Sequence, residues 1–243
     1  IAGVTSLAYD IAAGPSAEMS LVRTLTEAYI GSGAQVNARK DVLVVAHGSE
    51  DILAVTGGTT IAGDIALAGS AGIISLNTRT HAFIDGAKVN AEGNVLISAD
   101  DMTDTDNVSG NGSLGLGVSA GASHGVTLIQ KDTEAWIAGG AEVNAKANAA
   151  TGIDVFGGRA NIKGLGVEAV SREDVFSLST SGSVGAATIA GAINAAVINA
   201  DTKAHIDGAL INQDQAGANA AQTVDVSAVD ETKIFGAAVD LTM

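Results

Sequence analysis

The chain has 243 residues, of which 31 are glycine, one is proline and none is cysteine, and its formal net charge is −15 at pH 7. The lack of cysteine excludes disulfides, thiolate metal sites and a cysteine nucleophile. The acidic balance argues against nucleic-acid partners and anionic membranes, because no basic stripe exists to displace the counterions of phosphates. Hydrophobic residues make up 47% of the chain and aromatic residues only 3%, so we expect a narrow core of Val, Ile, Leu and Ala.

One motif recurs four times. It reads T-x-A, an aromatic residue or His, I-x-G-A-x, Val or Ile, and then Asn, and the copies span residues 26–38, 80–91, 133–145 and 202–213. Successive closing Asn residues are 53, 54 and 68 residues apart, so we place an expansion of about 14 residues in the last interval, near residues 171–200. A fixed period of this kind is typical of a solenoid.

Short runs of alternating residues follow the motifs and predict strands with one buried face. We expect their Val, Ile, Leu and Ala side chains to point inward, and we expect residues 100–107 to form a polar loop between strands. The runs are Val42, Val44 and Ala46; Val95, Ile97 and Ala99; Leu114, Leu116, Val118 and Ala120; Leu165, Val167 and Ala169; and Val224, Val226 and Ala228.

These elements predict an all-β fold, a right-handed parallel β-helix (β-solenoid) built from repeats of about 54 residues. No 3.6-residue stripe separates the strands, which argues against crossover helices. We expect residues 1–243 to be a single solenoid segment of a longer chain. With roughly 20–25 residues per coil, each repeat would supply two to three coils, and about ten coils would stack into a rod of roughly 50 Å.

The positions within the motif have distinct expected roles. The Ala and Ile should point inward and the glycine should supply the turn. The aromatic position should lie on the surface; its residues are Tyr29, Phe83, Trp136 and His205. In a stalk these side chains would be scattered over the surface, whereas in a glycan-binding module they would line one groove. The closing Asn should sit at a corner, several coils from the next copy and so without a continuous ladder; these residues are Asn37, Asn90, Asn144 and Asn212.

Candidate chemistry is sparse. The four histidines share no metal-ligand spacing, so we interpret them as structural residues and not as ligands, with His205 on the surface in the aromatic position of the motif; they are His47, His81, His124 and His205. A calcium loop is the one metal alternative, but it lacks a glycine at the bend and a closing bidentate Glu, so a solvated loop is preferred. Its candidate ligands are Asp100, Asp101, Asp104 and Asp106.

Other functional classes have weaker support. The carboxylates are scattered and the aromatics fall one per motif, so the pattern does not favour a polysaccharide hydrolase or lyase, and we expect no catalytic residues and no cofactor. The glycines of residues 110–121 match no phosphate loop; we expect them to form a flat outer face that packs against a neighbouring rod. Residues 183–200 carry no charge but are mostly small or polar, so we expect no membrane insertion.

From about Thr24 to Phe235, the motif followed by V-x-V-x-A and G-x-G-V-x-A strands resembles the repeat regions of large secreted bacterial exoproteins. The similarity is to the leukotoxin-type filamentous adhesins of the filamentous-haemagglutinin group. It implies a right-handed β-helix exported by a type V two-partner pathway to the bacterial cell surface, acting in adhesion, biofilm formation or toxin presentation. The chain shows no secretion, receptor-binding or toxin domain, so such activities would reside elsewhere.

We therefore expect a structural stalk or fibre segment that spaces or displays other domains. Its expected partners are other copies or adjacent segments of the same protein, joined end to end or laterally. The alternatives are a solenoid module that binds a host or matrix glycan or protein on one face and, third, a polysaccharide-active enzyme.

Overall fold

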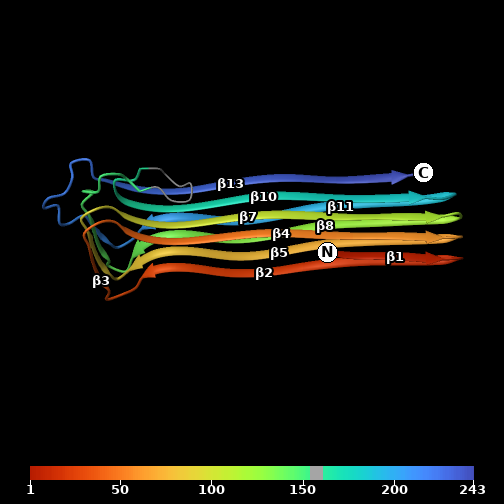
Figure 1. Cartoon of the computed structure of the whole chain (residues 1–243), viewed down its shortest axis with the longest axis horizontal. Coiled ribbons are helices and arrows are strands. Elements are labelled where there is room, and N and C mark those ends of the chain that lie inside the picture. Colours follow the sequence, from red (N-terminus) through yellow and green to blue (C-terminus); the bar gives the residue numbers. More distant parts are fainter. Residues whose placement is uncertain (154–160) are drawn as a thin grey trace.

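The computed structural model describes residues 1–153 and 161–243, which form a flattened all-β solenoid with parallel strands (Figure 1). The predicted fold class is confirmed. Coils two, three and four each have two long strands and one short one. The strands are β1 (Ala2–Ala8), β2 (Ile11–Ile30) and β3 (Gln35–Ala38) in coil one; β4 (Val42–Ala62), β5 (Ile65–Asp85) and β6 (Lys88–Ala91) in coil two; β7 (Val95–Gly115), β8 (Val118–Ala138) and β9 (Glu142–Ala145) in coil three; β10 (Gly164–Val184), β11 (Ala187–Ile206) and β12 (Leu210–Ile211) in coil four; and β13 (Thr223–Thr242), which begins a fifth.

The coils stack into three parallel sheets. Sheet A has the order β1-β4-β7-β10-β13, sheet B the order β2-β5-β8-β11 and sheet C the order β3-β6-β9-β12. Val42 pairs with Val95, and Lys88 with Glu142, so one repeat makes one coil. The prediction of two to three coils per repeat is wrong, because β7 runs without a break through the expected loop at residues 100–107.

The proportions of the molecule differ from the predicted rod. Five strands of sheet A, about 4.8 Å apart, stack to only about 19 Å, whereas a strand of about 21 residues extends roughly 70 Å. The slab is therefore longest along its strands, as Figure 1 shows, and not along the stacking axis. The predicted rod of ten coils and roughly 50 Å is wrong because each repeat makes one coil and not two to three.

The expansion of the last repeat lies between β9 and β10. The offset between paired residues rises from 54 for Ala91 and Ala145 to 70 for Val95 and Leu165, so 16 residues are inserted there. Later in coil four, two single-residue deletions reduce the offset to 68, the value at which Ile211 pairs with Val143. The net expansion over the earlier offset of 54 is therefore 14 residues, as in the Asn spacing. The predicted position at residues 171–200 is wrong, because β10 and β11 pair there with coil three in continuous register.

At the end of the slab that carries sheet C, three sheets enclose an apolar core. We call this end the base. The predicted inward runs of β4, β7 and β10 pack into this core, and Val95, Ile97 and Ala99 are fully buried. The run of Val224 and Val226 on the end strand β13 is exposed, against the prediction. Tight turns into sheet C use glycines with positive φ, among them Gly86 at 59°. The core of the base comprises Val44, Ala46, Ala82, Ile84, Ala87, Val89, Ala91, Val95, Ile97, Ala99, Ala135, Ile137, Ala141, Val143, Ala145, Leu165, Val167 and Ala169.

Beyond the base, only sheets A and B face each other. We call this part the blade; in coils two to four it comprises residues 48–78, 101–131 and 171–200. Its inward side chains are largely small and polar, and many of its outward side chains are apolar. The buried polar residues include Thr60, Ser70, Thr105, Asn107, Ser109, Ser113, Ser119, Ser123, Thr127, Ser177, Ser179 and Ser181.

The glycine-spaced strand therefore has its faces reversed relative to the prediction. Leu114, Leu116 and Val118 are exposed, Leu116 by 77%, while the intervening small residues face the other sheet. The two sheets approach too closely for larger side chains: a Cβ added at Gly121 would lie 2.5 Å from Oδ1 of Asn111. The expected flat outer face of glycine is wrong for Gly115 and Gly121, which face inward, whereas Gly110 and Gly112 do lie on the outer face of β7.

Candidate functional site

The aromatic residues of the motif form one stacked column on the outer face of sheet B. Ring centroids are 5.0 Å apart for Tyr29 and Phe83, 4.3 Å for Phe83 and Trp136, and 6.3 Å for Trp136 and His205, with 6° between planes in each pair. The column arises because one repeat makes one coil. The residues neither scatter nor line a groove; the inner ring faces cover one another and leave edges for a partner.

The motif asparagines also contact one another, against the prediction of no ladder. Asn90 Nδ2 donates to Asn37 Oδ1 and Asn144 Nδ2 donates to Asn90 Oδ1, each at 2.9 Å. These three lie within short strands of sheet C, so the expected corner position is wrong for them. Asn212 departs from the ladder: it has a φ of 52°, and its Oδ1 accepts a hydrogen bond from the Ala145 amide.

The predicted calcium ligands do not converge. They lie along β7, where successive side chains point to opposite faces of the sheet. Asp101 is buried between the sheets, whereas Asp104 and Asp106 are on the outer surface. Desolvation, followed by the negative charge of Asp106, raises the pKa of Asp104. Asp100 is instead paired with His47 at 2.8 Å and with Arg172 at 3.0 Å, so the grouping proposed as one calcium site is wrong.

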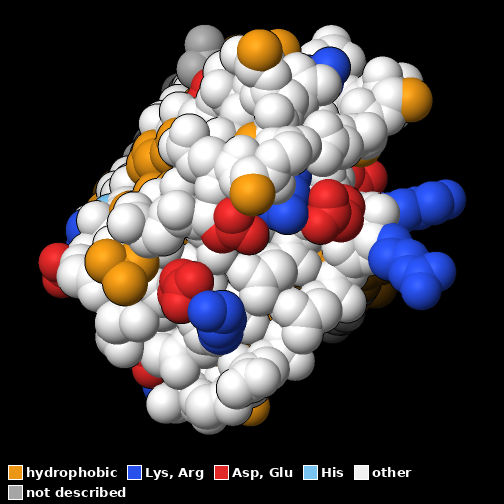
Figure 2. Space-filling view, turned by 90° about the vertical axis from the view of Figure 1, so that its left-hand side faces the viewer, with side chains coloured by type: hydrophobic (Ala, Val, Ile, Leu, Met, Phe, Trp, Pro, Cys, Tyr) orange, Lys and Arg blue, Asp and Glu red, His pale blue; other side chains and the backbone are white. Residues whose placement is uncertain are grey.

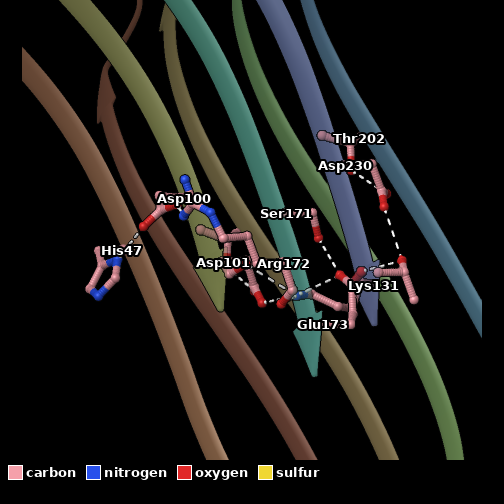
Figure 3. Close-up of polar contacts among 11 residues, drawn as sticks. His47, Asp100, Asp101, Lys131, Ser171, Arg172, Glu173, Thr202 and Asp230 are labelled. Carbon is pink, nitrogen blue, oxygen red and sulfur yellow. Dashed lines mark hydrogen bonds and ion pairs between the residues drawn. The ribbon is translucent and has the colours of Figure 1, made fainter. Parts of the chain in front are cut away.

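Where the blade meets the base, a fully buried lysine lies between two fully buried carboxylates (Figure 3). Lys131 Nζ is 2.6 Å from Oδ1 of Asp101 and 2.9 Å from Oε1 of Glu173. The same ammonium donates to the backbone carbonyls of Asp101 and Arg172 at 3.2 and 3.3 Å. Coils three and four thus meet at one cation, which has four oxygen partners in a fully buried site.

Hydroxyl groups complete this buried cluster. Glu173 accepts hydrogen bonds from Ser171 at 2.6 Å and Thr232 at 2.8 Å, and Asp101 accepts one from Thr80 at 2.7 Å. A third acid, Glu50, lies close by, and burial together with the charge of Asp101 raises its pKa to about 6. Three acids therefore lie around one lysine, and Glu50 gives up its proton less readily than an ordinary glutamate.

The sequence interpretation missed the buried cluster. Asp101, Lys131 and Glu173 are 30 to 72 residues apart in the sequence, and Asp101 was predicted to lie in a polar loop. One signal was present: in β8, Lys131 has the same parity as the inward residues Ile129 and Thr133. A charged residue in phase with a buried row is a sign of a buried ion pair.

The histidines lie closer to charged partners than their spacing along the sequence indicated. His47 is paired with Asp100, and His81 lies 3.3 Å from a carboxylate oxygen of Asp132. These partners come from neighbouring coils, so spacing along the sequence did not show them. His124 lies exposed on the outer face of β8.

The end of the slab seen in Figure 2 carries Lys, Arg, Asp and Glu side chains close together, with only scattered hydrophobic ones. Lys88 contacts Glu142 at 2.8 Å and Lys146 contacts Glu92 at 3.2 Å. Exposed pairs of this kind contribute little to stability. They leave this surface mixed in charge.

No family model, curated protein or solved structure was found to match this chain. Over residues 1–153 and 161–243, the fold contains no helix with the length and apolarity needed to cross a membrane.

Proposed function

We propose that this chain is a structural segment of a fibrous protein of the bacterial cell surface, of the filamentous-adhesin kind that its repeats resemble. In this proposal the segment spaces or displays other domains. It packs laterally, through the outer face of sheet B, against a second copy of the same surface.

The exposed apolar face of the blade carries this proposal. On sheet B the outward apolar side chains of four adjacent strands adjoin one another, with Ile189 as much as 71% exposed. We call these residues the apolar patch: Ile11, Met19, Leu21, Ile65, Leu67, Ile73, Val118, Val126, Leu128, Ile189, Ile193 and Val197.

The patch is large enough to form an interface. It extends about ten residues along four strands, which corresponds to roughly 600 Å² of flat surface. This is at the upper end of the largest apolar patches on monomeric proteins. Two copies packed face to face would bury roughly 1,200 Å² in total, the lower bound of a standard specific interface. Small residues between the large ones, such as Gly69 and Ala122, permit close packing of the two sheets.

Catalysis and glycan binding have less support. The buried charges around Lys131 have no contact with solvent, and the faces of the inner rings in the aromatic column are covered by neighbouring rings. A sugar would find ring edges where it needs ring faces. A lateral scaffold requires only the repeat and the patch.

Sedimentation equilibrium over a range of protein concentrations tests the proposal. The wild-type chain should show a mass that rises with concentration, and Leu67→Lys combined with Leu128→Lys should remain a monomer. Thr59→Lys combined with Ser49→Lys is the matched control, since it places two equal charges on exposed positions of sheet A. Association of the patch variant equal to that of the wild type would contradict the proposal, since pairing of strand edges would then be responsible.

A further inference from the structure

Near the junction of blade and base, the outer face of sheet B brings together one histidine and several acids. His81 on β5 has Glu27 of β2 and Glu134 of β8 as its neighbours in register. Asp132 lies two residues before Glu134, so both carboxylates point to the same face. Three coils therefore contribute side chains to one spot.

The imidazole is held among these carboxylates. His81 Nε2 is 3.3 Å from Oδ2 of Asp132, and Nδ1 is 3.8 Å from Oε1 of Glu27. The contact at Nε2 lacks hydrogen-bond alignment, so this buried ring nitrogen has no hydrogen-bond partner. The side chain is only 15% exposed. A buried ring nitrogen among oxygen acceptors is costly unless a proton or another cation occupies the space between them.

The spacing of the ligand atoms suits a small cation. One ligand atom each from His81, Asp132 and Glu134 lies within 4.8 Å of the others. In a tetrahedral zinc site with bonds of about 2.0–2.1 Å, ligand atoms are about 3.4 Å apart. The ligand atoms would therefore have to approach one another by at most about 1.4 Å on binding.

We propose that His81, Asp132 and Glu134 bind a divalent transition-metal cation, with Zn²⁺ as the preferred ion. A mixed imidazole and carboxylate set suits Zn²⁺, whereas Ca²⁺ and Mg²⁺ prefer oxygen ligands alone. His205 orients the site from coil four, since its Nδ1 lies 3.6 Å from Oε1 of Glu134. Trp136 fixes the plane of the imidazole through an edge contact, with 5.4 Å between ring centroids.

Two positive side chains flank the site. Lys203 follows Glu134 in register, but it is hydrogen-bonded to Asp201, which raises the lysine pKa. Arg79 is the register neighbour of Asp132. The local acids outnumber these two cations, so the field at His81 favours a dication; the acids are Glu27, Asp132, Glu134 and Asp201.

The single tryptophan of the chain lies next to the proposed site and reports on it. Addition of Co²⁺, which quenches tryptophan fluorescence, should quench Trp136 with a saturation point near one equivalent, and Zn²⁺ should reverse the quenching by displacement. Substitution His81→Gln should weaken both effects at least tenfold, because it removes the only imidazole ligand. The control His124→Gln, an exposed histidine elsewhere on β8, should leave both titrations unchanged.

Zn²⁺ joins coils two and three, so it should also raise the melting temperature of the wild type but not of His81→Gln. If His81→Gln loses its β-sheet circular dichroism, Asp132→Asn takes its place in both assays. Quenching that Zn²⁺ does not reverse, or equal affinity in the wild type and the His81 or Asp132 variant, would overturn the proposal. An equal loss in His124→Gln would do the same.

Discussion

In the base, three sheets surround Val, Ile and Ala, whereas in the blade two sheets close on Ser, Thr, Asn and Gly, although the same long strands run through both. The base excludes water from apolar side chains, and the hydrophobic effect stabilises it. In the blade, hydroxyl groups bond across the gap: Ser109 lies 3.0 Å from Ser123 of sheet B and 3.0 Å from Ser179 of the next coil. The blade is therefore held mainly by backbone ladders and buried polar contacts, together with one apolar row formed by Leu76, Ile129 and Val175.

The comparison of base and blade shows that the alternation of residues along a strand does not by itself identify which face of the strand is buried. Where a third sheet widens the coil, large apolar residues fill the interior. Where two sheets meet directly, most inward positions hold small residues, as at Gly121 and Gly125, and larger apolar side chains are confined to the part near the base, where Leu76, Ile129 and Val175 form one buried row. The apolar residues of the blade then face outward and become available for association. The buried cluster around Lys131 lies at the border between the two regions.

Loss of the buried lysine should have the largest effect. Lys131→Met leaves Asp101 and Glu173 buried without a cation, so we expect a loss of about 3–5 kcal/mol in the free energy of unfolding by denaturant titration at neutral pH. A triple variant that adds Asp101→Asn and Glu173→Gln should recover most of the loss. A single-variant loss below about 1 kcal/mol would contradict the buried cluster.

A cavity in the base should have the next largest effect. Ile137 is fully buried in the base core, and Ile137→Ala should lower the free energy of unfolding by about 3 kcal/mol. Ile189, an exposed isoleucine of the apolar patch in the blade, is its matched control, and Ile189→Ala should change the stability of the monomer by less than about 0.5 kcal/mol. Equal losses would remove the distinction between base and blade.

The sequence predicted the base better than the blade. Period-two runs with Val, Ile and Ala identified the inward residues 95, 97 and 99, and the motif located the glycine turns. The blade was missed because its inward Ser and Thr rows were interpreted as surface or loop. The clusters at Lys131 and His81 were missed because their partners lie one or more coils away, at distances in sequence that only the coil length reveals.

Substitution of Glu50 should have a smaller effect, and it should raise the stability of the fold instead of lowering it. The pKa of Glu50 is raised to about 6 from 4.5, so the native state binds more protons than the unfolded state between these pH values. Stability should therefore fall as pH rises from about 4.5 to 6. Above pH 6, Glu50→Gln should be more stable than the wild type by about 1 kcal/mol, a value reduced for partial solvent screening, and the gain should vanish below pH 4.5. Thermal melts across this range check it; a constant difference would exclude titration of Glu50 as the cause.

The smallest effect is expected for a single hydroxyl in the blade. Ser109→Ala removes one hydroxyl between Ser123 and Ser179 while keeping a small side chain, so the loss should be about 1 kcal/mol. Ser109→Val is the informative comparison. It should cost more than the alanine variant, because the two sheets leave no room for added methyl groups. A gain in stability from valine would show that the serine rows of the blade accept a larger apolar side chain.

The central claim, that one repeat makes one coil, places Ser75 directly beside Leu128 on the outer face of sheet B. The chain has no cysteine, so Ser75→Cys with Leu128→Cys introduces a single pair of thiols. Strands about 4.8 Å apart place the Cα atoms within disulfide range, and mild oxidation of the dilute monomer should give one intramolecular disulfide, detected by mass spectrometry of the digest. If each repeat made two or three coils, the thiols would be about 10–14 Å apart, and failure to form the disulfide in the folded monomer would contradict the account.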